Sequence, residues 1–256
     1  MDPAFIVLGL LVGLLVGMTG VGAGSLVTPA LALSGVPAAV AVGTDLAYAA
    51  ISKSFGALVH RAQRTLDLRV AGLLALGSVP AATLTLAALA TGAAQDRART
   101  ITWMLALALV LTALALLAGR DRLAAFAARY DTHIAPRRAA LTVLSGALLG
   151  TLVTLSSVGA GALGAALLVI LHPSMPAARI AGVDIAHAVP LTAVAGLGHF
   201  WLGHVDLVLA GTLLAGAIPG ILAGSLLAGR LPEVLIRRLL ALVLLGAGAR
   251  LAAAGF

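Results

Sequence analysis

The chain has 256 residues, of which 61% are hydrophobic and only 10% are charged, and its mean hydropathy is +1.13. A soluble domain is about 25% charged, so this chain has too few polar residues to cover a water-facing surface. Many apolar runs approach the ~20 residues that a helix needs to cross the hydrocarbon core of a bilayer. The alternation of polar and apolar residues that a membrane β-barrel requires is absent, so we predict an all-α polytopic membrane protein.

The formal net charge of +7 would indicate nucleic-acid binding in a soluble chain. In a membrane protein, basic loop residues more often set the topology, and we expect no nucleic-acid partner. The chain has no cysteine, which excludes disulfide bonds and thiolate metal sites. No nucleotide-binding motif occurs either, so we expect no cofactor, no metal site and no dependence on ATP.

Apolar segments follow one another in two groups of five. The first group covers 4–18, 21–34, 37–59, 68–90 and 98–118, and the second covers 139–155, 158–172, 176–202, 205–229 and 232–253. The basic segment 120–138 separates the groups. We therefore divide the chain into an N-terminal repeat over 1–119, a basic cytoplasmic linker over 120–138 and a C-terminal repeat over 139–256.

Matched residues indicate that the two halves arose by duplication. The tetrapeptide Val-Gly-Ala-Gly at 21–24 recurs at 158–161, an offset of 137. Further along the chain the offset is 139: Asp45 matches Asp184, His60 matches His199, Asp67 matches Asp206, and Pro80 matches Pro219. Internal repeats of this kind are typical of secondary transporters.

The basic residues predict that the repeats are inverted relative to each other. Arginines between the third and fourth segments and in the linker indicate two cytoplasmic loops, and Arg230, Arg237 and Arg238 place the connection of the ninth and tenth segments on the same side. Inversion needs an odd number of crossings in each half. Five full spans would satisfy this, but fifteen helical residues reach only about 22 Å. We expect each half to be a short re-entrant hairpin followed by three spans, with both termini outside.

The Gly-rich turns between the short segments form the first candidate site. Free N–H groups and the dipole at a helix start attract anions, and glycine lets a ligand approach the backbone. The candidate substrate-binding residues at the two turns are Thr19, Gly22, Gly24, Ser25, Ser156, Ser157, Gly159 and Gly161. Close helix packing is the alternative explanation for such glycines, and it is the role expected of Gly216, Gly220 and Gly224.

Ionisable and polar residues inside the predicted spans form a second group: Asp45, Tyr48, Lys53, Asp184 and His187. Such residues are costly in lipid and usually face the bundle interior. Asp184 and His187 are three residues apart on one helix face, so they are candidates for a proton relay or for substrate contact. In the structural alternative, Asp45 pairs with Lys53 and Asp184 caps backbone amides of a broken helix.

Other matched polar residues are assigned to structure. Asp67 and Asp206 directly precede apolar segments and are predicted to be helix N-caps. His60 and His199 are expected at the membrane boundary. Pro190 is expected to loosen or kink the helix that carries Asp184.

Three stretches resemble the TauE/SafE family of sulfite exporters and toluene-sulfonate uptake permeases: "GLLVGMTGVGAGSLVTPALAL", "AVGTDLAYAAISKSFGALVHR" and "GHVDLVLAGTLLAGAIPGILAGSLLAGRLP". The resemblance covers about residues 5–250 and implies a multi-pass transporter of the bacterial inner membrane. It maps the Gly-rich motif of the family onto Gly20, Gly22 and Gly24, and a Gly-Thr motif onto Gly43 and Thr44. Thr44 thereby joins the candidate substrate-binding residues.

The chain departs from the family pattern at two positions. Asp45 stands where many relatives carry a small polar residue, and Val183 stands in place of the Thr of the second Gly-Thr motif. An aspartate near the site would either repel an anion or carry a coupled proton. The resemblance therefore leaves the substrate and the coupling ion undecided.

We expect a secondary transporter of a small anion such as sulfite, sulfoacetate or another sulfonate, with the substrate between the two Gly-rich tips. The expected partners are that anion, the lipid bilayer and coupled protons, and homo-oligomerisation is left open. A passive anion channel is the main alternative, because sequence barely separates the two. An intramembrane enzyme is disfavoured, since no HExxH or GxSxG motif and no cysteine occurs.

Overall fold

The computed structural model describes residues 3–19, 24–92, 94–227 and 233–254, and every regular element in these ranges is a helix. The first half contains α1 (Pro3–Thr19), α2 (Gly24–Leu33), α3 (Ala38–Ala62), α4 (Leu68–Thr91) and α5 (Ala94–Ala118). The linker contains α6 (Arg120–Ala128), α7 (Asp131–Ile134) and the short 3-10 helix η1 (Ala135–Arg137). The second half contains α8 (Arg138–Ser156), α9 (Ala162–Leu171), α10 (Ala177–Trp201), α11 (Leu207–Leu227) and α12 (Glu233–Ala254).

The helix lengths fit a protein that spans a membrane. Five described helices are both long and apolar enough to cross a bilayer, and they fall at Leu68–Thr91, Asp96–Ala118, Asp131–Ser156, Ala177–Trp201 and Leu207–Gly224. α9 is apolar but has only ten residues, too few to cross. α3 has 25 residues but carries charged side chains along its length. The all-α polytopic fold predicted from composition is therefore confirmed.

Helices of the two halves correspond in position and in packing. α3 and α10 begin 139 residues apart (177 − 38), as do α4 and α11 (207 − 68). α1 packs along α11, and α8 packs along α4, which is the reciprocal pairing of corresponding helices. α3 packs against α10 in antiparallel orientation, because Gly56 faces Ile185 while Gly196 faces Ala47.

Glycines allow the backbones of α1 and α11 to touch. A Cβ atom added to Gly216, Gly220 or Gly224 of α11 would overlap the main chain of α1, so only a hydrogen atom fits at these positions. The contacts recur once per turn: Gly216 with Ile6, Gly220 with Leu10, and Gly224 with Leu14. Membrane helices commonly associate through such small residues. The packing role predicted for these three glycines is confirmed.

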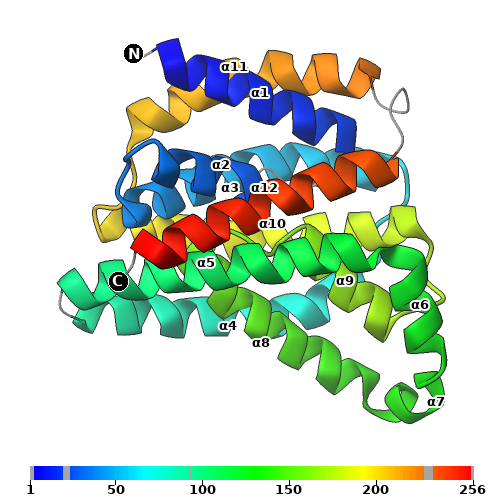
Figure 1. The fold of residues 1–256 in the computed structure, drawn as a ribbon. Helices are drawn as coiled ribbons and strands as arrows, with labels where there is room; N and C mark the ends of the chain where they lie inside the picture. Colours follow the sequence, from blue (N-terminus) through cyan, green and yellow to red (C-terminus); the bar gives the residue numbers. More distant parts are fainter. Residues whose placement is uncertain (1–2, 20–23, 93, 228–232, 255–256) are drawn as a thin grey trace.

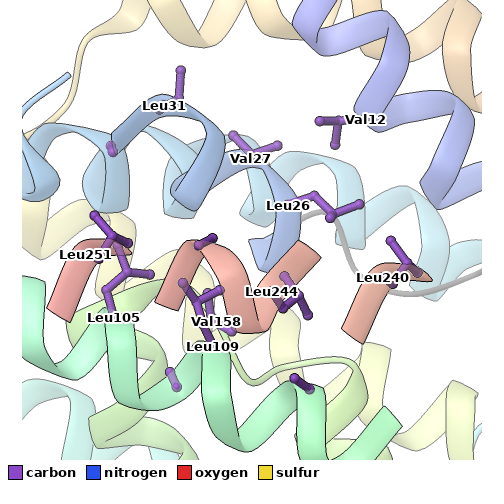
Figure 2. Packing of buried hydrophobic residues seen from close by; sticks show 14 of the residues in the cluster. Val12, Leu26, Val27, Leu31, Leu105, Leu109, Val158, Leu240, Leu244 and Leu251 are labelled. Carbon is purple, nitrogen blue, oxygen red and sulfur yellow. The ribbon is translucent and has the colours of Figure 1, made fainter. Parts of the chain in front are cut away.

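The apolar core on one side of the molecule lies where α12 passes between α2 and α5 (Figure 2). Leu31 of α2, Leu105 and Leu109 of α5, and Leu244 of α12 are almost completely buried there. On the other side α9, α10 and α5, which correspond to α2, α3 and α12, enclose the cavity described below. The two sides are therefore packed differently.

Both chain termini lie at one end of the bundle, and α6 and α7 lie at the opposite end (Figure 1). The end of α9 returns to this linker end, because His172 lies 3.2 Å from the Thr142 hydroxyl near the start of α8. α8 and α9 therefore form a hairpin that enters and leaves at the same end.

The predicted caps are confirmed. The Asp67 carboxylate accepts a hydrogen bond from the Val70 amide at 3.2 Å, and Asp206 accepts one from the Leu209 amide at 2.9 Å. α10 continues through Pro190 as one helix. The linker, which the sequence presented only as a polar bridge, is largely helical, since apolar residues of α6 pack against α9.

Candidate functional site

The tip of the second hairpin is a tight turn between α8 and α9. Ser157 ends α8 in the left-handed region with φ of 57°, and Gly159 and Gly161 have φ of 126° and 140°. Side chains other than glycine are strained at such angles, so these two glycines are required by the turn. The Ser156 hydroxyl, fully buried, donates to the Leu152 carbonyl at 2.6 Å and accepts from the Val158 amide at 3.1 Å. Ser156 thus stabilises the turn, and its predicted contact with a substrate stays a prediction.

Asp45 of α3 joins this turn to the first hairpin. Its Oδ2 atom accepts hydrogen bonds from the Thr28 hydroxyl of α2 at 2.6 Å and from the Ser157 hydroxyl at 2.8 Å. All three side chains are buried, and Asp45 is completely inaccessible to solvent. The free energy of this hydrogen bond to a carboxylate also offsets the strain of the left-handed backbone conformation at Ser157. Asp45 is therefore the point at which α2, α3 and the second hairpin meet.

Lys53 lies two turns further along α3 and holds the other side of the same turn. Its Nζ atom donates to the Ala160 carbonyl at 2.9 Å. No ion pair between Lys53 and Asp45 is found among the described residues, so the two charges are not in close contact. The Lys53 charge nevertheless interacts electrostatically with Asp45 and with Asp184. α3 therefore fixes the turn with one carboxylate and one ammonium group.

Asp184 of α10 lies at the inner end of a cavity of about 300 Å³. The cavity runs between α5, α9 and α10, and Arg120 and Arg237 border it at the linker end. Gly161 and Ala162, at the start of α9, line it together with Asp184. The cavity therefore connects the linker end of the bundle with the tip of the second hairpin.

The Asp184 carboxylate occupies the N-terminus of α9. The Gly161 backbone amide interacts favourably with this carboxylate, while its buried Oδ1 atom has no hydrogen-bond partner. A Cβ atom added to Gly164 would overlap Oδ1, so the absence of a side chain at Gly164 lets the carboxylate reach the first turn of the helix. A negative charge is favourable at this end of a helix. The arrangement has the form of the predicted cap, and it leaves one carboxylate oxygen unsatisfied.

His187 and Tyr48 are buried but do not extend this cluster by hydrogen bonds. His187 Nε2 lies 3.0 Å from the Ser78 hydroxyl of α4, and its Nδ1 atom has no partner. Among the described hydrogen bonds, none joins His187 to Asp184. The Tyr48 hydroxyl is buried without a partner.

Thr44 and the first hairpin contribute differently from the second. The Thr44 hydroxyl accepts a hydrogen bond from the Asp206 backbone amide at 3.0 Å, so it anchors the connection between α10 and α11. Gly20 and Gly22 lie outside the described residues, and for Thr19, Gly24 and Ser25 only the backbone is described. The predicted site at the first tip stays a prediction.

His199 lies in the last turn of α10, which agrees with the expected boundary position, and the structure buries its side chain completely. Its Nε2 atom donates to the Thr154 carbonyl at 2.9 Å, near the end of α8, where carbonyls lack partners within the helix. Its Nδ1 atom lies 3.1 Å from His204 Nδ1. Burial, reinforced by the charge of Arg97, lowers the pKa of His204 and favours its neutral form.

Thr28 is the residue of the cluster that sequence reasoning missed. The corresponding positions of the second half hold apolar residues, so the duplication gave no signal for it. Among the described residues, no group of three or more His, Asp or Glu side chains is arranged to hold a metal ion.

Comparison with known proteins identifies the family. Residues 5–251 match the family described as sulfite exporter TauE/SafE. The chain belongs to the TauE/SafE family. A relative, the "Probable membrane transporter protein YjnA" of Bacillus subtilis (strain 168), is 38% identical over 255 residues, which are 98% of this chain and 100% of that protein. No solved structure matches the chain.

This TauE/SafE protein is therefore a multi-pass membrane transporter and not an enzyme. The resemblance noted in the sequence is confirmed over nearly the whole chain. Within the fold, Asp45, Lys53 and Asp184 all act on the second hairpin turn, although they come from different halves of the protein. The transporter thus gathers these three charged residues around the second hairpin turn, and Asp184 is the one of the three that lines the cavity.

Proposed function

We propose that the protein is a secondary transporter of a small anion, namely sulfite, sulfoacetate or another sulfonate, in the bacterial inner membrane. The observation that carries the proposal is the cavity that ends at the N-terminus of α9, beside Asp184 and within the electrostatic reach of Lys53. The family description, sulfite exporter, supports a sulfur anion as the substrate, and the printed name of the Bacillus relative supports membrane transport.

The chemistry of the turn suits an oxyanion. The first N–H groups of α9 have no partners within the helix, and the helix dipole adds a partial positive charge. Lys53 supplies a full positive charge on the opposite side of the turn, where it now bonds to the Ala160 carbonyl. A substrate oxygen that reaches Gly161 and Ala162 would therefore find backbone donors and a nearby ammonium group.

Asp184 links this binding to protons. Its carboxylate already occupies the helix end that a substrate anion needs, so the two negative charges compete for the same amides. Protonation of Asp184 removes its charge and frees the N-terminus of α9. We infer that one proton travels with the anion, and that Asp184 carries it.

The distribution of basic residues supports an orientation with the linker in the cytoplasm and both termini outside. The linker carries Arg120, Arg122, Arg129, Arg137 and Arg138, and Arg237 and Arg238 of α12 line a cavity together with linker residues. At the other ends of α5 and α12 lie fewer described arginines, namely Arg97 and Arg99 near the start of α5 and Arg250 near the end of α12. In this orientation the cavity faces the cytoplasm.

Antiparallel packing of α3 and α10 and the reciprocal helix pairs support two inverted repeats. The cavity lies between α5, α9 and α10, whereas the corresponding helices α12, α2 and α3 meet in a packed apolar cluster that includes Leu31, Ala41 and Leu251. Exchange of these two packings between the halves would close the cytoplasmic cavity and open one on the outer face.

The proposal is tested by reconstituting the purified protein in vesicles and measuring flux of labelled sulfite, sulfoacetate and taurine under imposed pH and voltage gradients. We expect saturable flux of at least one sulfur anion, with accumulation against its own gradient. Rapid flux that never exceeds equilibrium would indicate a passive channel instead. No flux of any of these anions would overturn the proposed substrate class.

A further inference from the structure

A second cavity lies at the linker end of the bundle, at the level where apolar helices meet the basic linker. It has a volume of about 330 Å³ and lies between the end of α5, the start of α6 and the start of α12. Its apolar wall includes Leu117 and Val234, which are 42% and 49% exposed on the outer surface of the helices. One side of this cavity is therefore continuous with the surface that faces lipid.

The other wall is strongly basic. Among the described lining residues, Arg120, Arg122, Arg237 and Arg238 are basic and Asp121 is the single acidic one, an excess of three positive charges (4 − 1). Asp121 lies 3.9 Å from Arg120, and both are exposed, so this pair is weak. Arg120 also donates to the Met175 carbonyl at 3.2 Å, which holds it beside α9.

We propose that this cavity binds the headgroup of an anionic glycerophospholipid. Guanidinium groups match the geometry of phosphate oxygens, and clusters of arginine beside membrane helices favour anionic lipids. The neighbouring Leu117 and Val234 offer an apolar surface to the acyl chains, which a soluble phosphate compound would not use. A ligand that uses both the basic wall and the apolar wall must carry a phosphate group and acyl chains, which favours a lipid over a free anion.

Lipid binding at this position bears on the main cavity. Arg120, Arg237 and Gly119 line both cavities, so the two share a wall. A phosphate held by Arg237 fixes one of the two arginines that border the main cavity at the linker end. The lipid site is independent of the transport proposal, because it stands on its own lining residues, but its occupancy is coupled to the shape of that opening.

The test compares lipids retained by the purified protein in native mass spectrometry, after reconstitution with phosphatidylglycerol or with phosphatidylcholine. Arg122→Gln and Arg238→Gln remove charges that line only the second cavity, and Arg129→Gln removes a linker charge that lines neither. Each lining charge contributes about 1 kcal/mol near a membrane surface, so we expect about fivefold weaker phosphatidylglycerol binding for each lining variant. Arg129→Gln should change binding less than twofold.

A soluble competitor distinguishes the two sources of phosphate. Inorganic phosphate at millimolar concentration should leave the bound phosphatidylglycerol in place. Displacement by inorganic phosphate would overturn the lipid assignment, as would equal retention of phosphatidylcholine. Unchanged phosphatidylglycerol binding in the Arg122→Gln/Arg238→Gln double variant, with its thermal unfolding unaltered, would overturn the site itself.

Discussion

Thr28→Val tests the junction at which Asp45 joins the two hairpins. The substitution keeps the shape of the side chain but removes one of the two hydroxyl groups that donate to Asp45 Oδ2, at 2.6 Å and 2.8 Å. A hydrogen bond to a charged group contributes about 1.5–3 kcal/mol, and its loss leaves a buried carboxylate with one donor fewer. We expect Thr28→Val to lower the free energy of unfolding by that amount.

Thr212→Val is the matched control. Thr212 is also buried, but its hydroxyl donates to the Val208 carbonyl of its own helix at 2.7 Å, and that carbonyl keeps a backbone partner. Loss of the Thr212 hydrogen bond should lower the free energy of unfolding by about 1 kcal/mol or less. Reversible unfolding in mixed detergent micelles, followed by tryptophan fluorescence, measures both variants.

A double-mutant cycle isolates the charge. In an Asp45→Asn background the hydroxyl of Thr28 meets a neutral acceptor. The decrease in the free energy of unfolding caused by Thr28→Val should therefore be at least about 1 kcal/mol smaller than in the wild type. The claim that Asp45 joins the two hairpins would be refuted by equal decreases in unfolding free energy for Thr28→Val and Thr212→Val. It would also be refuted if the effect of Thr28→Val were unchanged in the Asp45→Asn background.

Three further predictions follow from particular contacts. Asp184→Asn should abolish the response of flux to a pH gradient, whereas one coupled proton lets the wild type accumulate substrate about tenfold per pH unit; full pH-dependent flux in the variant would exclude Asp184 as the proton carrier. Gly220→Ala should destabilise the protein by about 1–3 kcal/mol, because its Cβ would overlap the α1 backbone, while Gly211→Ala, with no atom within 4 Å of its Cβ, should be neutral or stabilising in the same unfolding assay. Burial, and then the charge of Arg138, lowers the pKa of His172, so the folded protein binds fewer protons there than the unfolded chain. Thermal stability should therefore fall as the pH drops below about 6.5, and His172→Gln should reduce that slope; an unaltered slope would contradict the assignment.

The helices were largely predictable because the bilayer fixes their length and composition. The apolar segment 68–90 corresponds to α4 at Leu68–Thr91, and the Asp67 cap was visible from its place before that segment. The periodic glycines of α11 likewise marked a helix contact before the partner helix was known. Local chemistry was sufficient for these features.

Features that depend on contacts between distant segments could not be predicted. Thr28 and Ser157 are 129 residues apart (157 − 28), yet they share one oxygen of Asp45. Lys53 bonds to a carbonyl 107 residues away, and His199 to one 45 residues away. Sequence spacing along one helix suggested Asp45–Lys53 and Asp184–His187 pairs instead, because it carries no information on which helices lie beside them.

The central claim is that a substrate anion binds at the start of α9, at the inner end of the main cavity. The chain has no cysteine, so Ala162→Cys introduces a single thiol at this position, and Ala177→Cys introduces one elsewhere in the same cavity. The measurement is the rate of maleimide labelling of each variant with and without sulfoacetate. We predict that sulfoacetate slows labelling of Ala162→Cys in a saturable manner and leaves Ala177→Cys unaffected, whereas equal labelling of Ala162→Cys with and without every transported anion would contradict the proposed site.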